Sequence, residues 1–208
     1  MASFLWHNYH STDRHDKFTL DLRYTSYVDI SELATGVSEE QTQLFRQLET
    51  LRQRNIREAR RAGAQVEAGL DPADLLRFYA ALMAGQGSPA TAGKLERMDR
   101  LIRALVGARR AVVFGVRDPA GLIQYMTVFC FDRKRAYYLF GAGNPESDSR
   151  YTGTLAFWDA FRYLATRHDV TCVDLEGVNS PRRGWFKLSF GGDLRSYYQV
   201  YKRSPHSA

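Results

Sequence analysis

Two acidic side chains near the carboxyl end of the chain have the type and spacing of a proton acceptor. Asp174 and Glu176 stand at the end of Val170 to Leu175, an apolar run with the composition of a strand. In a strand, side chains two positions apart point to the same side. Two carboxylates held close together raise the pKa of one of them toward neutrality, which suits a base. We expect Glu176 to be a base or a substrate ligand, unless both carboxylates pair with Arg182 or Arg183.

A lysine between two aromatic residues is the second candidate. Lys187 lies between Phe186 and Phe190, and two glycines follow this group. Glycines permit the backbone to come close to a ligand. The alternative is that the aromatic residues belong to the core and that Lys187 points to water. Tyr197 and Tyr198, in the last strand-like run, are candidates to protonate a leaving group, although tyrosine-rich strands also build cores.

An anion site is predicted where a helix is expected to begin, at Thr152. Free backbone amides and the helix dipole bind anions at a helix amino terminus. Arg150, Thr152, Gly153 and Thr154 are therefore candidate ligands for the phosphate groups of a cofactor. The alternative is a plain helix cap by Thr152 or Thr154.

A stripe of arginines on an earlier helix is the third feature. Arg54, Arg57 and Arg61 are three and four positions apart and share one face, with Arg46 near it. The net charge of +6 over 208 residues also favours an anionic partner, such as a phosphate-bearing cofactor, a nucleotide sugar or RNA. The alternative is a solvated helix face.

Several other classes of site are not supported by the sequence. His7 and His10 stand near the amino terminus without a cysteine or carboxylate cluster, so we expect no metal. There is no Walker loop, dinucleotide fingerprint or nucleophile elbow. Cys130 and Cys172 lie in apolar runs and predict unpaired thiols in a reducing compartment. We expect a cytoplasmic protein, since neither a membrane-spanning run nor a secretory signal is present.

The remaining pattern predicts the elements that position these groups. A short strand is expected at Tyr27 to Ile30, and a capping box at Ser38 to Gln41 begins a helix that ends at Gly63. Two more helices follow, one capped by Asp71 and one stopped by Gly107. Further strands are expected at Ala111 to Val116, Leu122 to Phe131, Ala136 to Phe140, Val170 to Leu175 and Ser196 to Tyr201, with a helix near Thr152 to Thr166. This order predicts a mixed, mostly antiparallel sheet flanked by helices, with a crevice at the carboxyl ends of its strands.

The run DLEGVNSPRRGWFKLSFGGDLRSYYQV, which begins at Asp174, resembles the end of Fem-like N-acyltransferases of the GNAT superfamily. Its Phe186-Lys187-Leu-Ser-Phe190-Gly-Gly stretch reproduces the family's motif in full. LRQRNIREARRAG, which ends at Gly63, is similar to the family's arginine-rich helix. Arg150 and Gly153, but not Leu155, fit the pattern with which GNAT enzymes cradle the pyrophosphate of acyl-coenzyme A. The resemblance covers about Tyr27 to Tyr201 and only the second half of long Fem enzymes.

The resemblance implies a GNAT fold of the α+β/α/β class and an N-acyltransferase that moves an acyl group from acyl-coenzyme A to an amine. The amine belongs to a cell-envelope sugar, a peptide or a small metabolite. Lys187 is then expected near the transferred group and Phe186 beside the cofactor. The substrate would contact the following residues: Arg54, Arg57, Arg61, Asn179 and Arg183.

Two alternatives stay open at this point. The donor could be aminoacyl-tRNA, as in the peptidoglycan-bridge relatives, or the domain could bind a nucleotide sugar or RNA without catalysis. Residues 1–24 are expected to form an arm or the remnant of an upstream half, 25–203 one GNAT-like domain, and 204–208 a disordered tail. A homodimer could replace the missing half.

Overall fold

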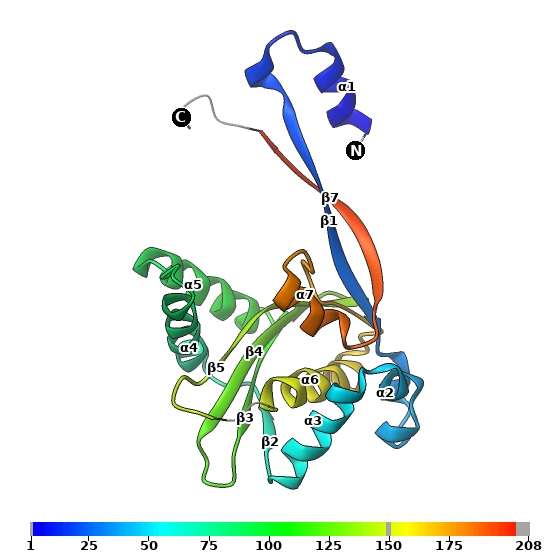
Figure 1. Ribbon diagram of the computed structural model, residues 1–208, viewed down its shortest axis with the longest axis vertical. Coiled ribbons are helices and arrows are strands. Elements are labelled where there is room, and N and C mark those ends of the chain that lie inside the picture. The colour runs from blue at the N-terminus through cyan, green and yellow to red at the C-terminus, as the bar shows by residue number, and fades with distance from the viewer. Residues whose placement is uncertain (1, 149–150, 203–208) are drawn as a thin grey trace.

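A seven-stranded sheet forms the centre of the computed structural model, which describes residues 2–148 and 151–202. The strand order is β2-β3-β4-β5-β6-β1-β7 (Figure 1). The strands are β1 (Phe18–Asp29), β2 (Gln65–Ala68), β3 (Ala111–Arg117), β4 (Ile123–Phe131), β5 (Arg135–Gly143), β6 (Cys172–Asp174) and β7 (Asp193–Lys202). β5 and β6 are parallel and the other neighbouring strands are antiparallel. The predicted mixed, mostly antiparallel sheet is confirmed.

Helices cover both faces of this sheet, as Figure 1 shows. The α-helices are α1 (Ala2–His10), α2 (Gln43–Gln47), α3 (Thr50–Arg61), α4 (Pro72–Gly85), α5 (Ala92–Gly107), α6 (Thr152–His168) and α7 (Pro181–Leu188), and the short 3-10 helices are η1 (Arg14–Asp16), η2 (Ser31–Ala34) and η3 (Glu39–Gln41). Among these helices none is long and apolar enough to cross a membrane in the described part of the chain.

The central strand β4 is apolar on both of its faces, because it separates two hydrophobic cores. Phe129 packs with α3, α6 and α7 in the larger core, whereas Met126 and Val128 pack with α4 and α5 in the smaller one. Cys130, also on β4, and Cys172 are free and half-buried thiols. The sequence prediction of a central strand here is confirmed.

The prediction of one continuous helix from Ser38 to Gly63 is wrong. The chain forms η3, α2 and α3 in succession, because Thr42 and Leu48 adopt extended backbone angles and interrupt the helical path. Ser38 makes no side-chain capping bond, and Thr42 caps α2 in its place. The break at Leu48 rotates the buried face, so that Arg52 is buried and Leu51 is exposed.

We expect Thr42→Ala to lower the free energy of unfolding by about 1 kcal/mol. The Thr42 hydroxyl accepts the Phe45 amide at 3.2 Å and donates to the Glu39 carbonyl at 2.6 Å, and the side chain is 1% exposed. Ser38→Ala is the matched control and should leave stability unchanged. Urea denaturation measures both variants. A larger loss in the Ser38 variant would contradict the cap seen in the structure.

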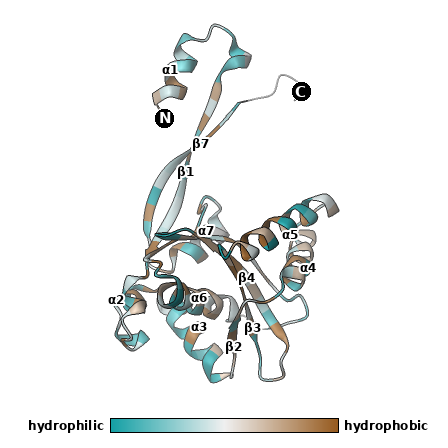
Figure 2. Ribbon diagram, turned by 180° about the vertical axis from the view of Figure 1, so that it is seen from behind, coloured by the Kyte–Doolittle hydropathy of each residue, from teal (hydrophilic) through white to brown (hydrophobic). Residues whose placement is uncertain are grey.

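The first strand is much longer than predicted and forms a projecting arm. β1 pairs with β7 from Phe18 to Tyr27, and this two-stranded ribbon stands away from the body with α1 at its far end (Figures 1 and 2). Large exposed apolar side chains, among them Trp6, Tyr9 and Tyr198, lie on the arm. The strand begins at Phe18 because its partner lies at the other end of the chain, a pairing that local sequence does not reveal.

Two other strands differ from the prediction. β2 was not predicted, because it is short and carries the polar residues Gln65 and Glu67 at the edge of the sheet. β6 covers only Cys172–Asp174, since its pairing with β5 ends at Asp174. The segment predicted as irregular or a short helix contains α7, which brings Lys187 over the ring of Tyr138 on β5.

Candidate functional site

The parallel strands β5 and β6 separate after a short pairing, and this separation defines the candidate site. Their last paired residues are Tyr137 and Asp174. β5 then shifts register against β4 around Tyr138 and continues to Gly143, whereas the chain after β6 follows β1 instead. A register shift of this kind redirects side chains locally. Ligands of α/β sheets bind where neighbouring strands diverge at their carboxyl ends.

Lys187 spans the opening between the two diverging strands. Its ammonium group lies 5.0 Å from the centre of the Tyr138 ring on β5 and donates to the carbonyl oxygens of Glu176 and Gly177, at 3.1 and 3.3 Å, beyond β6. α7 holds it there, because the neighbouring Phe186 packs against Phe157 of α6. Lys187 is therefore half-buried at the strand separation and does not point into bulk solvent.

Glu176 lies beside this lysine with a pKa above its ordinary value. Burial of the carboxyl is the main cause, the charge of Asp174 raises the pKa further, and Lys187 lowers it. The two carboxylates are near each other, as predicted, but strand alternation is the wrong reason. Glu176 has a φ of 56° and lies outside β6, so alternation does not apply to it.

Asp174 has a different role from Glu176. It is buried and accepts hydrogen bonds from the Thr25 hydroxyl and from the Glu176 amide, the latter at 2.8 Å. These bonds fix the left-handed turn at Glu176 and tie it to β1. Asp174 therefore positions the base candidate, and the sequence hypothesis that it shares the proton-accepting role is not favoured by its contacts.

A hollow of about 310 Å³ opens next to Lys187 at the root of the arm. Its lining consists of Arg23, Gly177, Asn179, Ser180 and Lys187. Asn179 was expected to bind substrate, but its amide group exchanges two hydrogen bonds with the Tyr24 backbone, at 2.8 and 3.0 Å. It therefore anchors the loop after β6 to β1. The side chain of Arg183 is outside the described part of the chain.

The beginning of α6 combines small residues with a buried arginine. No side chain caps the helix, and the described residues provide no hydrogen-bond partner for the Thr152 and Gly153 amides. The Thr154 hydroxyl, expected to face a cofactor, instead accepts from Arg52 at 3.1 Å and is 1% exposed. Arg150 lies outside the described residues.

Arg52 is a site residue that sequence reasoning did not select. Its guanidinium is 6% exposed, donates to the hydroxyls of Ser189 and Thr154, and lies under the rings of Trp185 and Phe186. Burial lowers its pKa, the nearby charge of Glu49 raises it, and among the described residues Arg52 forms no direct ion pair. The sequence does contain one signal for this residue. Arg52 stands four positions before Ile56, so both share one face of α3, and a charge on that apolar face is unusual.

The predicted arginine stripe lies on the other face of α3. Arg57 pairs with Glu40 at 2.8 Å, Arg61 pairs with Glu58 at 3.0 Å, and Arg54 is exposed. The structure thus does not bring these arginines together with Lys187. It also separates the two tyrosine candidates, since neighbouring residues of β7 point to opposite faces. The Tyr197 hydroxyl lies near Gly177, so Tyr198 points away from the hollow.

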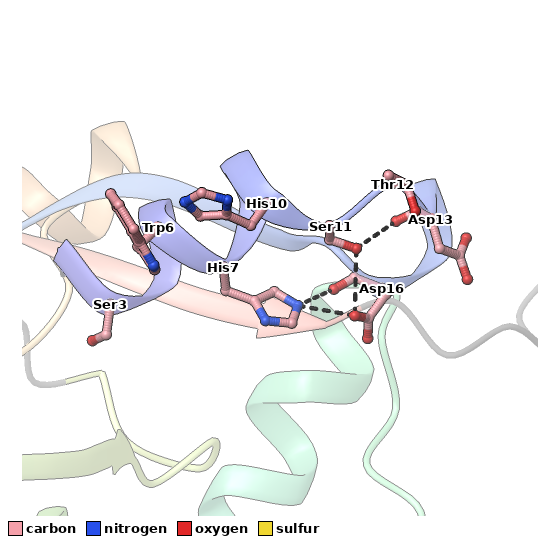
Figure 3. Close-up of a pocket in the computed structure, with 8 residues that line it drawn as sticks. All are labelled: Ser3, Trp6, His7, His10, Ser11, Thr12, Asp13 and Asp16. Carbon is pink, nitrogen blue, oxygen red and sulfur yellow. Dashed lines mark hydrogen bonds and ion pairs between the residues drawn. The ribbon is translucent and has the colours of Figure 1, made fainter.

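A second hollow, of about 510 Å³, lies at the far end of the arm (Figure 3). Figure 3 shows that His7 turns toward Asp16, whose carboxylate it contacts at 3.1 Å, while His10 packs against Trp6. No three histidine, cysteine, aspartate or glutamate side chains in the described ranges are placed to hold a metal ion.

This mixed sheet, with helices on both faces, belongs to a known family of domains. The family described as "Acetyltransferase (GNAT) domain" matches residues 46–188, which is more than half of the chain. The chain therefore belongs to the GNAT acetyltransferase family. A comparison with curated protein sequences gives no match.

Solved structures with a similar fold include FemX, at 15% identity and a TM-score of 0.66, over 86% of this chain and 62% of that chain. The C-terminal domain of a putative lysylphosphatidylglycerol synthetase from Agrobacterium fabrum matches at 15% identity and a TM-score of 0.59, over 90% and 62%. A tandem GNAT protein from the clavulanic acid biosynthesis pathway matches at 14% and 0.52, over 89% and 54%. The chain thus spans 62% of the first two, and these likenesses establish the fold.

Proposed function

We propose that the chain is an N-acyltransferase that moves an acyl group from acyl-coenzyme A to an amine at the separation of β5 and β6. The observation that carries this proposal is that Lys187 donates to the backbone carbonyl of Glu176, a residue whose carboxyl group has a raised pKa. Acyl transfer to an amine is accelerated by a proton acceptor and by a hydrogen-bond donor or positive charge near the carbonyl oxygen. One side chain of each type lies at the place where the fold opens.

In the proposed reaction the neutral amine attacks the carbonyl carbon of the thioester. The ionised Glu176 accepts the proton that the nitrogen loses, and the charge of Lys187 stabilises the oxyanion of the tetrahedral intermediate. Collapse of that intermediate breaks the carbon–sulfur bond and releases the thiolate of coenzyme A. The thiolate takes up a proton from Glu176, which restores the base.

The donor's phosphate groups are proposed to bind at the beginning of α6. The amides of Thr152 and Gly153 and the helix dipole favour an anion there. Arg52 adds a buried positive charge below the same turn, since it is bonded to Thr154. Because this charge has no ion pair with a described carboxylate, an arriving anion would gain from it.

Aminoacyl-tRNA is the second candidate donor. The net charge of +6 and the resemblance of the Phe186-Lys187 segment to Fem-like enzymes favour it. The same pair of side chains would serve, because the acyl group of either donor is attacked at its carbonyl carbon. The difference lies in the leaving group, which is a ribose hydroxyl in place of a thiolate.

Thermal unfolding with each donor separates these candidates. A ligand that binds only the folded state stabilises it by about 2.7 kcal/mol at 100 times its Kd. We expect coenzyme A to raise Tm and uncharged tRNA to leave it unchanged. The reverse result would support the aminoacyl-tRNA donor. If neither ligand raises Tm, the catalytic proposal is contradicted and a binding role for the domain is favoured.

A further inference from the structure

The hollow at the root of the arm contains a cation, Arg23, that the acyl-transfer proposal does not use. Arg23 of β1 and Lys187 of α7 both line it, together with Gly177, Asn179 and Ser180, and none of the described residues in this lining carries a carboxylate. The two cations come from elements far apart in the sequence. Because the hollow measures about 310 Å³, it is of a size for a small charged group.

Arg23 lines this hollow from strand β1 of the arm. Its Nε donates to the side-chain oxygen of Gln199 on β7 at 3.1 Å, and it is half-buried. Among the described residues no carboxylate pairs with it. Tyr197 is the direct partner of Arg23 in the β1–β7 register, and its hydroxyl lies near Gly177. The same face of the ribbon therefore supplies a guanidinium and a phenol to one place.

Arginine presents a planar set of donors that matches a carboxylate or a phosphate. Glu176 adds the opposite charge near the hollow, since its carboxyl interacts electrostatically with Lys187, which lines the hollow. A ligand that complements these charges carries an anion, held by Arg23, and an amine, directed to Glu176. This pattern is that of a zwitterion.

We propose that this hollow binds the acceptor, and that the acceptor is an amine with a carboxylate or phosphate group close to it, held by Arg23. This inference rests on the proposed function, because it assigns the amine substrate of that site. It makes Arg23 a specificity-determining residue located on the arm. The arm then has a part in the site in addition to its place in the sheet.

The test measures binding of small amines by NMR titration, without donor and without turnover. Glycine is compared with glycinamide, and phosphoethanolamine with ethanolamine, so that the carboxylate and the phosphate are examined separately. For the wild type we expect at least one of the amines that carry an anionic group to bind more tightly than its counterpart without that group. Arg23→Gln should weaken that binding about ten-fold, the size of one charge-assisted hydrogen bond, and Arg23→Lys should restore part of it.

Arg195→Gln is the matched control, because Arg195 lies on the same ribbon but is paired with Asp193 at 3.2 Å. It should bind the anionic amine as the wild type does, and an unchanged Tm in all variants confirms folding. The proposal is overturned if the wild type does not distinguish the two members of either pair, or if Arg23→Gln retains the preference.

These outcomes are separable from those of the proposed function. Anion-dependent binding that is lost in Arg23→Gln, in a protein without turnover, would support the acceptor hollow and contradict acyl transfer. Turnover that is indifferent to the acceptor's anion and to Arg23 would support acyl transfer and contradict the hollow.

Discussion

Lys187→Met is expected to lower kcat by about 10²–10³-fold, the effect of removing one group that stabilises an oxyanion. Methionine retains an unbranched stem that can lie over the Tyr138 ring, but it has no charge. Lys187 lies 5.0 Å from the centre of that ring, at the separation of β5 and β6. Single-turnover and steady-state assays with acyl-coenzyme A and an amine measure the loss, which should fall on kcat more than on KM.

Lys94→Met is a matched control for this variant. Lys94 also lies over a tyrosine ring, that of Tyr79, at 5.4 Å, but in the smaller core on the other side of the sheet. Its replacement should leave kcat unchanged. Lys187 also donates to the carbonyls of Glu176 and Gly177, so a purely structural lysine would lower Tm without changing kcat of the folded enzyme. Unchanged turnover in Lys187→Met would remove this residue from the mechanism.

Much of the fold could be predicted because its signals are local. α4 begins where Asp71 and Pro72 predict a helix, and the Asp71 carboxylate accepts the Ala73 amide at 2.8 Å. The three-strand meander is joined by short turns, so its strands follow from alternation and turn residues. The Phe186-Lys187 segment also has a local pattern, which led to the lysine at the strand separation.

The parts that were missed depend on contacts between distant segments. Residues from Phe18 onward form a strand because β7 pairs with them, and Arg23 reaches the site only through that pairing. Arg52 is buried because the chain breaks at Leu48 and turns that face of α3 toward α6. When the break at Leu48 is not known, helical spacing selects the exposed arginines Arg54, Arg57 and Arg61 instead. Tertiary context thus decided which arginines belong to the site.

The backbone turn at Glu176 also could not be predicted from the alternation of side chains along a strand. A non-glycine residue with a φ of 56° is uncommon and requires contacts that hold it. Asp174 and Lys187 supply them, through the Glu176 amide and carbonyl. Sequence reasoning proposed Asp174 and Glu176 as candidate proton acceptors and preferred Glu176, without assigning Asp174 a different role. Their contacts show that Asp174 is a buried anchor and that the neighbouring Glu176 has a carboxyl group whose pKa is raised.

Glu176→Gln is expected to lower kcat/KM by about 10²–10⁴-fold, the usual contribution of a positioned general base. Burial raises the pKa of Glu176, and the charge of Asp174 raises it further. In the wild type, kcat/KM should therefore fall as the pH is lowered through this raised pKa, because the base becomes protonated. The residual activity of Glu176→Gln should lack that acid limb. A pH–rate profile of both proteins measures the difference, and Glu67→Gln, on an exposed glutamate paired with Arg117, is the matched control.

The pH dependence of the free energy of unfolding is a second and independent test of the raised pKa of Glu176. Since the pKa of Glu176 is higher in the folded state than in the unfolded chain, the folded state binds its proton more tightly. The free energy of unfolding of the wild type should then fall as the pH rises from the ordinary glutamate range through the raised pKa. Glu176→Gln should not show this fall, so the variant gains stability relative to the wild type above that window and not below it. If instead both the acid limb and this stability difference are absent from the wild type, Glu176 ionises as an ordinary surface carboxylate, and the base must be sought elsewhere around the separation of β5 and β6.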